Sequence, residues 1–131
     1  MTIRRTDTLR NTLATTLNTQ RGVNAQIQVR SGVNAGTGGQ GTLLAQLTGN
    51  GTAWGVASNG VLTANAITAD TSADATGIAG HYQINTQAAV FLESGLLDGT
   101  DGATIDNSSI VAGQTVQIGS WVNTMAYDDG V

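Results

Sequence analysis

The hydrophobic pattern of this chain consists of short alternating runs separated by turn signals. Along residues 23–30 the apolar side chains occupy every second position, which is typical of a strand with one buried face. The same alternation returns in residues 78–85 and 115–123, and further apolar runs cover 43–47, 54–57, 61–67, 90–92 and 105–110. Turn signals recur roughly every 8–12 residues, which predicts an all-β fold, an antiparallel β-sandwich or barrel of about 7–8 strands.

Residues 41–84 are the centre of this prediction. Asn59-Gly60 stands between two apolar runs, and this dipeptide suits a type I′ hairpin turn because both residues tolerate a positive φ. Gly49-Asn50-Gly51 gives a similar signal after the run 43–47, so we expect an antiparallel meander. The glycine-rich residues 31–41 are expected to form a flexible loop without core-forming side chains.

A short helix is predicted before the first strand. Thr6 or Asp7 can cap it, and Gly22 can end it. Its apolar side chains follow at four-residue spacing and form a narrow stripe: Leu9, Leu13 and Leu17. Because the many Thr and Asn residues are poor helix formers, this stripe must dock on something to be stable. It either covers an open end of the β domain or docks on an adjacent subunit.

The chain is short enough to form one β domain with two appendages. We expect an N-terminal helical arm at residues 1–22, a β-sandwich domain at residues 23–123 and an acidic tail at residues 124–131. No apolar run approaches the roughly 18 residues of a membrane span, and no apolar stretch follows the first arginines. Neither a membrane segment nor a secretory signal is therefore expected.

Composition indicates a protein that is partly covered by a neighbour. Only 11% of the residues are charged, well below the typical quarter or so. The chain has no cysteine, which excludes a disulfide framework and thiolate chemistry. A surface with so few charges is unusual for a monomer in solution, so we expect part of it to lie against another subunit.

The charges are also divided along the chain. The first 30 residues carry a net charge of +4, and the remainder has eight acidic residues and no basic one. The basic side chains are Arg4, Arg5, Arg10, Arg21 and Arg30. The basic segment is expected to meet an acidic surface, which could belong to another copy, a scaffold protein or nucleic acid, unless its arginines only solubilise an exposed helix. Sequence-specific nucleic-acid binding is not expected, because no aromatic residue lies among the arginines.

No catalytic or metal-binding pattern is complete. His81, the single histidine, is predicted on the exposed polar side of its strand, and no nucleophile or orienting carboxylate can be paired with it. Asp98, Asp101 and Asp106 lack the closing glutamate of a calcium loop, so tight Asp-Gly turns explain them better. Asp70 and Asp74 lie in a Thr/Ser/Ala-rich connection, which favours turn capping over a glycosidase pair. We expect no enzyme, no cofactor and no metal, although calcium or glycan binding by a loop stays open.

Two stretches resemble a known group of proteins. The segment GTLLAQLTGNGTAWGVASNGVLTANAITADTSADATG at residues 41–77 and SSIVAGQTVQIGSW at residues 108–121 are similar to small virion structural proteins of tailed bacteriophages. Those proteins are described as minor structural or head-decoration proteins. The similarity covers residues 1–122 and is strongest at 41–79, and the chain departs from the pattern at its Arg-Arg start, at 27–30 and after Trp121. The family has no catalytic residues to carry over.

The resemblance implies a capsid decoration, or cement, protein on the virion surface that is assembled in the host cytoplasm. Such a protein would bind the major capsid protein or other virion proteins as a homo-oligomer, a trimer at local symmetry axes being one arrangement. No membrane would be involved. The expected contact residues lie on the helical arm: Arg4, Arg5, Leu9, Arg10, Leu13 and Leu17.

A tail or head-fibre component is the alternative. It would act as an adhesin-like module that contacts the host surface through loops 31–41 and 98–103. Glycan sites usually present aromatic side chains, and the chain offers Trp54, Trp121 and Tyr127 for that role.

Overall fold

The computed structural model describes residues 3–34, 36–50 and 54–125, and these ranges contain one helix and eight strands. Helix α1 covers Asp7–Arg21. The strands are β1 (Gln26–Ser31), β2 (Leu43–Thr48), β3 (Val61–Thr63), β4 (Gly77–Asn85), β5 (Phe91–Gly95), β6 (Ala103–Ile105), β7 (Ser109–Ile110) and β8 (Ile118–Thr124). Every pairing between them is antiparallel. The predicted β-rich fold with a short N-terminal helix is confirmed.

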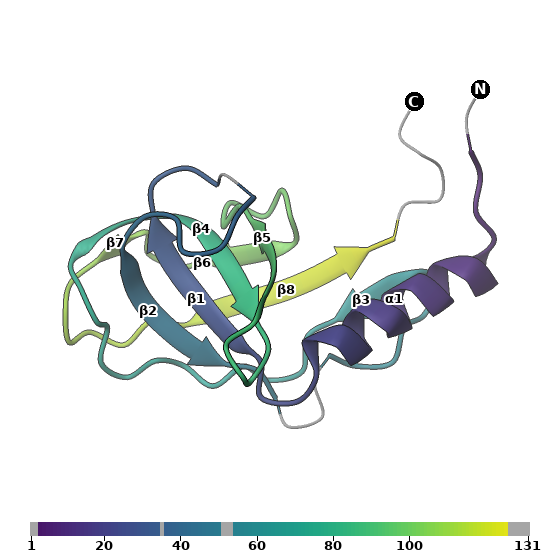
Figure 1. The fold of residues 1–131 in the computed structure, drawn as a ribbon, viewed down its shortest axis with the longest axis horizontal. Coiled ribbons are helices and arrows are strands. Elements are labelled where there is room, and N and C mark those ends of the chain that lie inside the picture. Colours follow the sequence, from purple (N-terminus) through teal and green to yellow (C-terminus); the bar gives the residue numbers. More distant parts are fainter. Residues whose placement is uncertain (1–2, 35, 51–53, 126–131) are drawn as a thin grey trace.

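The strands form two sheets. The larger sheet has the order β2-β1-β4-β5, with β7 added at the start of β4, and the smaller sheet has the order β3-β8-β6. The core consists mainly of aliphatic side chains from both sheets, among them Ile27, Val29, Leu44, Leu47, Leu62, Ile84, Ile110 and Ile118. Figure 1 shows that β8 runs from the sandwich toward α1 and β3, so the helix lies at one end of the long axis beside β3.

An aromatic cluster joins the two sheets. Trp121 of β8 lies edge-on to Tyr82 of β4, with 4.4 Å between ring centroids, and edge-on to Trp54 at 5.5 Å. All three rings are buried. Edge-to-face packing suits aromatic rings because it places a positive ring edge against a negative face. The cluster therefore holds β8 against the larger sheet. Through Trp54 it also extends to the segment that contacts α1.

The predicted meander is only partly correct: residues 54–58 and 61–64 make antiparallel bridges around Asn59-Gly60, but β2 pairs with β1 and not with residues 54–57. Gly49 N–H donates to the Ala25 carbonyl, and Asn24 N–H donates to the Asn50 carbonyl, so the end of β2 is tied to the start of β1. β3 instead pairs with β8 in the other sheet. Between β2 and β3, residues 54–57 form no strand and pair with the rest of the chain only through isolated β-bridges. The Asn59-Gly60 turn is confirmed, because both residues have a positive φ, 50° and 73°.

The prediction of an exposed His81 is also wrong. Residues 81–85 of β4 are buried on both faces, because the glycine-rich loop between β1 and β2 lies over their polar side (Figure 1). Within this cover, Gly39 N–H donates to Gln83 Oε1 at 2.8 Å, and His81 Nδ1 lies 3.2 Å from the Gly32 carbonyl oxygen. The close approach needs Gly80, since a Cβ there would overlap the Gly32 carbonyl. A loop expected to be flexible thus completes the burial of β4.

The expected division of the chain can be compared with the structure at two points. Helix α1 ends where the arm was expected to end, at Gly22, whose φ is 70°. β8 extends through Thr124, and residues 126–131 of the expected acidic tail lie outside the described residues. None of the described helical segments has both the length and the apolar character needed to cross a membrane.

Candidate interaction surface

The ends of α1 are set by local sequence. Thr6 is the N-cap, and its Oγ1 accepts a hydrogen bond from Leu9 N–H at 3.2 Å. Asp7 lies in the first turn, where a negative charge favours the helix dipole. The Gly22 N–H donates to the Asn18 carbonyl at the other end. Both predicted end signals are therefore confirmed.

The face of α1 that contacts the rest of the protein is largely polar. Asn18 Nδ2 donates to the Trp54 carbonyl, and Trp54 N–H donates to Asn18 Oδ1, both at 2.9 Å. Two helical turns earlier, Asn11 Oδ1 accepts from Gly60 N–H at 2.7 Å. Ala14 lies between the two asparagines and is fully buried. Side-chain amides thus bind backbone groups of the segment between β2 and β3 and set the position of the helix.

Arg21 anchors the last turn of the helix. Its side chain has no exposed surface, and its Nη2 lies 2.5 Å from Glu93 Oε1 on β5. The same nitrogen donates to Asn123 Oδ1 on β8 at 2.9 Å, and the guanidinium carbon lies 4.4 Å from the Trp54 ring centre. The carboxylate and the aromatic face offset part of the cost of burying this guanidinium, whose Nε and Nη1 have no hydrogen-bond partner in the described part of the chain. Arg21 therefore connects α1 to both sheets.

The leucines of α1 point away from this attachment. Leu9 is 47% exposed and Leu13 is 41% exposed, while Leu17 is half-buried. The helix therefore lies against one end of the β domain through its polar face, and its leucine stripe is only partly covered. We call the exposed pair Leu9 and Leu13 the leucine surface. The leucines lie outside the attachment because the backbone groups of Trp54 and Gly60 need polar partners, which Asn18 and Asn11 supply.

The arginines expected beside the leucines divide into two groups. Arg10 turns inward: its Nε donates to the Met125 carbonyl at 2.9 Å, and its Nη1 lies 2.8 Å from Asp7 Oδ1. It belongs to the attachment of the helix. Arg4 is exposed and Arg5 is half-buried, and both precede the first turn. Of the three arginines, only Arg10 is thus shown to take part in holding the helix.

Sequence reasoning overlooked the attachment residues. Asn11, Ala14, Asn18 and Arg21 recur at intervals of three and four positions, so they share one helix face. That spacing was as regular as the spacing of the leucines. A face with two asparagines and an arginine does not indicate an attachment site, because polar residues on a helix usually face water.

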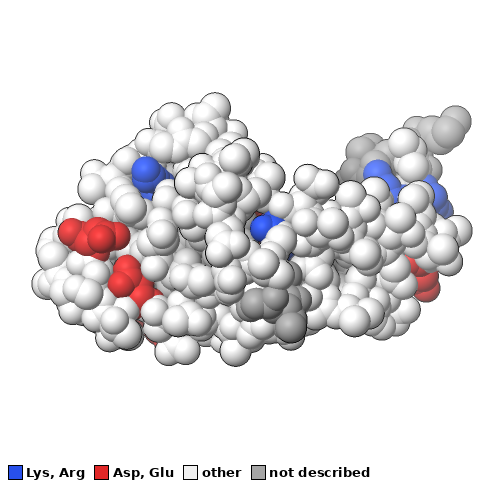
Figure 2. Space-filling model, turned by 60° about the horizontal axis from the view of Figure 1, so that its bottom comes forward, with Lys and Arg blue, Asp and Glu red and all other residues white. Residues whose placement is uncertain are grey.

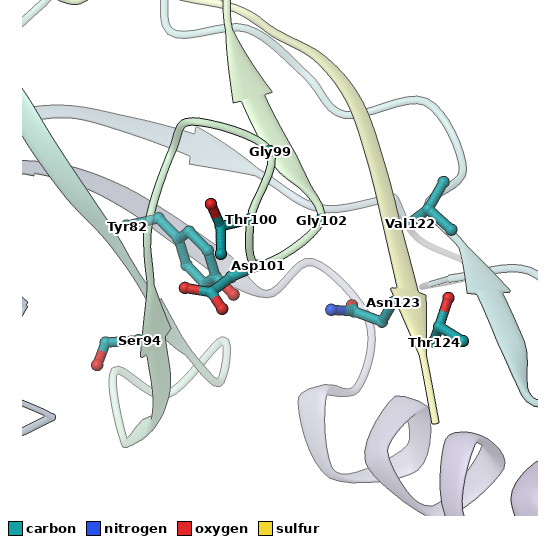
Figure 3. Close-up of a pocket in the computed structure, with 9 residues that line it drawn as sticks. All are labelled: Tyr82, Ser94, Gly99, Thr100, Asp101, Gly102, Val122, Asn123 and Thr124. Atoms are coloured by element: carbon teal, nitrogen blue, oxygen red, sulfur yellow. The ribbon is translucent and has the colours of Figure 1, made fainter. Parts of the chain in front are cut away.

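A hollow with a volume of about 440 Å³ lies between the β5–β6 turn and β8 (Figure 3). Asn123 points into it from β8, whereas Val122 and Thr124 point to the other side of the strand. Tyr82 lines the opposite wall, and burial, reinforced by the Glu93 charge, raises the pKa of its phenol well above the usual range. Asp101 Oδ2 accepts from Leu96 N–H at 2.7 Å and so holds the turn. These groups do not form a nucleophile with a base.

Two more of the aspartates singled out in the sequence hold turns. Asp98 Oδ1 accepts from Thr100 N–H, and Asp70 Oδ1 accepts from Ser72 N–H, each at 2.9 Å. Within the described ranges, no three His, Cys, Asp or Glu side chains gather as a metal site would require. Figure 2 shows that charged atoms cover little of the face in view. The leucine surface, by contrast, places two exposed apolar side chains one turn apart on the same helix.

No protein-family model, curated protein or solved structure matches this chain.

The contacts of Asn18 with Trp54 predict how its removal changes stability. Asn18→Ala removes two hydrogen bonds and leaves the N–H and carbonyl of Trp54 unpaired, so the free energy of unfolding should fall by about 1–3 kcal/mol in urea denaturation. Thr19→Ala is the matched control, because Thr19 is exposed and bonds only within the helix. Equal stability of the two variants would show that the asparagine contacts do not hold the helix.

Proposed function

We propose that this protein is a structural component of a tailed-phage virion, a decoration or cement protein that binds the shell built by the major capsid protein. It works as a homo-oligomer, and α1 is the arm by which each copy contacts a neighbouring subunit. Its role is to reinforce joints between subunits, and it transforms no substrate.

The leucine surface carries this proposal. A helix in a globular protein normally turns its apolar stripe to the core, whereas α1 is bound through asparagine and arginine and exposes Leu9 and Leu13. Exposed apolar patches on soluble proteins mark contact sites. The helix is also held in one orientation before any partner binds, which lowers the entropic cost of association.

Composition and the sequence resemblance support the same proposal. Charged residues make up only 11% of the chain, as suits a protein whose surface is partly covered in an assembly. Residues 41–77 and 108–121 resemble phage virion proteins, and this resemblance favours a virion as the assembly. The adhesin alternative gains no support from Trp54 and Trp121, because both are buried and neither can stack on a glycan. Tyr127 lies outside the described residues.

Binding to capsids that lack the protein tests the proposal. The double variant Leu9→Ser/Leu13→Ser should bind such capsids roughly 30- to 1,000-fold more weakly, since each buried leucine contributes about 1–2 kcal/mol. Thr12→Ser/Thr16→Ser is the matched control, because it changes exposed positions of the same helix and leaves the leucines in place. Circular dichroism confirms that both variants fold.

Two results would contradict the proposal. Wild-type protein that fails to bind capsids at any salt concentration would remove the virion role. Wild-type-like binding by the leucine variant would remove α1 as the contact arm. Counting copies per particle then separates the two virion roles, because a decoration protein is present in many copies and a fibre component in few.

A further inference from the structure

The lining of the hollow between the β5–β6 turn and β8 runs from exposed residues to a buried one. Thr100 and Asp101 are exposed, Asn123 is half-buried, and Tyr82 on the inner wall is 3% exposed. The volume of about 440 Å³ lies in the range of small-molecule sites. The hollow shares no residue with the leucine surface, so whatever it binds is independent of that contact.

The turn that forms one side of the hollow is held in place by the protein itself. The Gly102 carbonyl accepts from Val122 N–H at 3.1 Å, which ties the turn to β8. Asp101 ties it to the end of β5 through Leu96 N–H. A Cβ on Gly102 would overlap the Val122 carbonyl, so only glycine lets the turn lie this close to the strand. A site whose walls are fixed beforehand costs less entropy to fill.

Asn123 presents a hydrogen-bond donor to the hollow. Its Oδ1 accepts from Arg21 Nη2 at 2.9 Å, and a guanidinium can only donate, so this contact fixes the orientation of the amide. The Nδ2 group makes no hydrogen bond with any residue in the described ranges. Figure 3 shows it turned toward the side on which Tyr82 and Asp101 lie. Arg21 thus leaves the two N–H groups of this amide for a ligand.

The opposite side offers an acceptor and a phenol. Asp101 uses Oδ2 for Leu96 N–H, and its Oδ1 makes no hydrogen bond with the described part of the chain. Burial and the charges of Glu93 and Asp101 raise the pKa of the Tyr82 phenol, so the hydroxyl keeps its proton at neutral pH. This hydroxyl also has no hydrogen-bond partner among the described residues, and it can either donate or accept.

These groups select the chemistry of a ligand. An apolar molecule finds little to contact, because the side chain of Val122 points to the other side of its strand. An anion would lie against Asp101, and a cation would lie against the Asn123 donor. A neutral hydroxyl suits both, because it donates to a carboxylate and accepts from an amide. Since the groups lie on two sides of the hollow, the ligand must carry several hydroxyls on one frame.

We propose that this hollow binds one unit of a saccharide, whose hydroxyls donate to Asp101 Oδ1 and accept from Asn123 Nδ2 and the Tyr82 hydroxyl. The inference goes beyond the proposed function and does not depend on it. With no exposed aromatic face among the lining residues, hydrogen bonds supply the affinity. A dissociation constant of roughly 1–10 mM is expected from three such bonds.

Titration of the isotope-labelled full chain, followed by nuclear magnetic resonance, tests the site without capsids. The saccharide probes are the methyl glycosides of glucose, galactose and mannose and free N-acetylglucosamine, each added to roughly 100 mM, well above the expected dissociation constant. Cyclohexanol is the control with one hydroxyl on a ring of the same size. Ethylammonium chloride, sodium acetate and acetamide represent cations, anions and amides. At least one saccharide should shift the amide signals of Gly99, Gly102 and Val122 saturably, whereas the control compounds should not.

Two conservative variants locate the binding. Tyr82→Phe removes only the hydroxyl, and Asp101→Asn keeps an acceptor for Leu96 N–H while it replaces the charged acceptor by a neutral amide. Each should weaken saccharide binding about three- to tenfold. Thr124→Ser is the matched control, because it changes the residue next to Asn123 on the other side of β8 and should bind like the wild type. Unchanged amide signals elsewhere in the spectrum show that each variant is folded.

Three results would overturn the inference. Saccharides that leave the Gly99, Gly102 and Val122 signals unmoved would show that the hollow binds none of them. Equal or stronger shifts with cyclohexanol, ethylammonium, acetate or acetamide would show that the site takes another class of ligand. Wild-type affinity in both Tyr82→Phe and Asp101→Asn would place saccharide binding elsewhere on the protein.

Discussion

Arg21→Ala is expected to lower the free energy of unfolding by about 3–5 kcal/mol. The substitution removes a buried guanidinium and leaves Glu93 without its ion-pair partner and Asn123 without its donor. It also uncovers one face of Trp54. Because folded proteins are stable by only about 5–15 kcal/mol, this loss is a large fraction of the total. Equilibrium unfolding in urea measures it.

A double variant distinguishes the two possible causes of this loss of stability, the unpaired charge and the lost contact with Trp54. If unpaired charge dominates, Arg21→Met/Glu93→Met should recover most of the stability, since a well-packed apolar pair can replace a buried ion pair at little cost. If the contact with Trp54 dominates, the double variant should stay close to Arg21→Ala. Full wild-type stability of Arg21→Ala itself would contradict the assignment of Arg21 as an anchor of the helix.

Trp121→Ala is expected to cost about 3–5 kcal/mol as well, through the cavity left between the sheets. Trp121 is 1% exposed and contacts both Tyr82 and Trp54, so its removal disconnects the two sheets and the segment that receives α1. Thermal unfolding followed by circular dichroism measures the effect, because the change also removes a fluorophore.

Trp121→Phe is the conservative substitution at the same position. It keeps an aromatic ring against Tyr82 and should cost less than half as much as the alanine variant. If Trp121→Ala does not fold, a clear loss in Trp121→Phe still supports the role of the ring. A phenylalanine variant as stable as the wild type, together with a well-folded alanine variant, would show that the aromatic cluster is not needed.

The leucine spacing shows how far sequence could predict the contact site. Leu9, Leu13 and Leu17 predicted the helix and one of its stripes, and Thr6 and Gly22 predicted its ends, since each of these is a local property. Which face turns outward is not local. It depends on backbone groups of Trp54 and Gly60, which lie far along the chain and need the amides of Asn18 and Asn11.

The sequence by itself determined the class of fold, because alternation and turn residues act within a few positions. It placed most of the strands and the Asn59-Gly60 turn correctly. Only the tertiary structure decided which strands pair, since the chain after β2 leaves its sheet and β3 joins β8. Only the structure showed that a glycine-rich loop buries His81 and that Arg21 holds the helix. Those outcomes depend on contacts between residues that are far apart in the sequence, and no periodic pattern predicts such contacts.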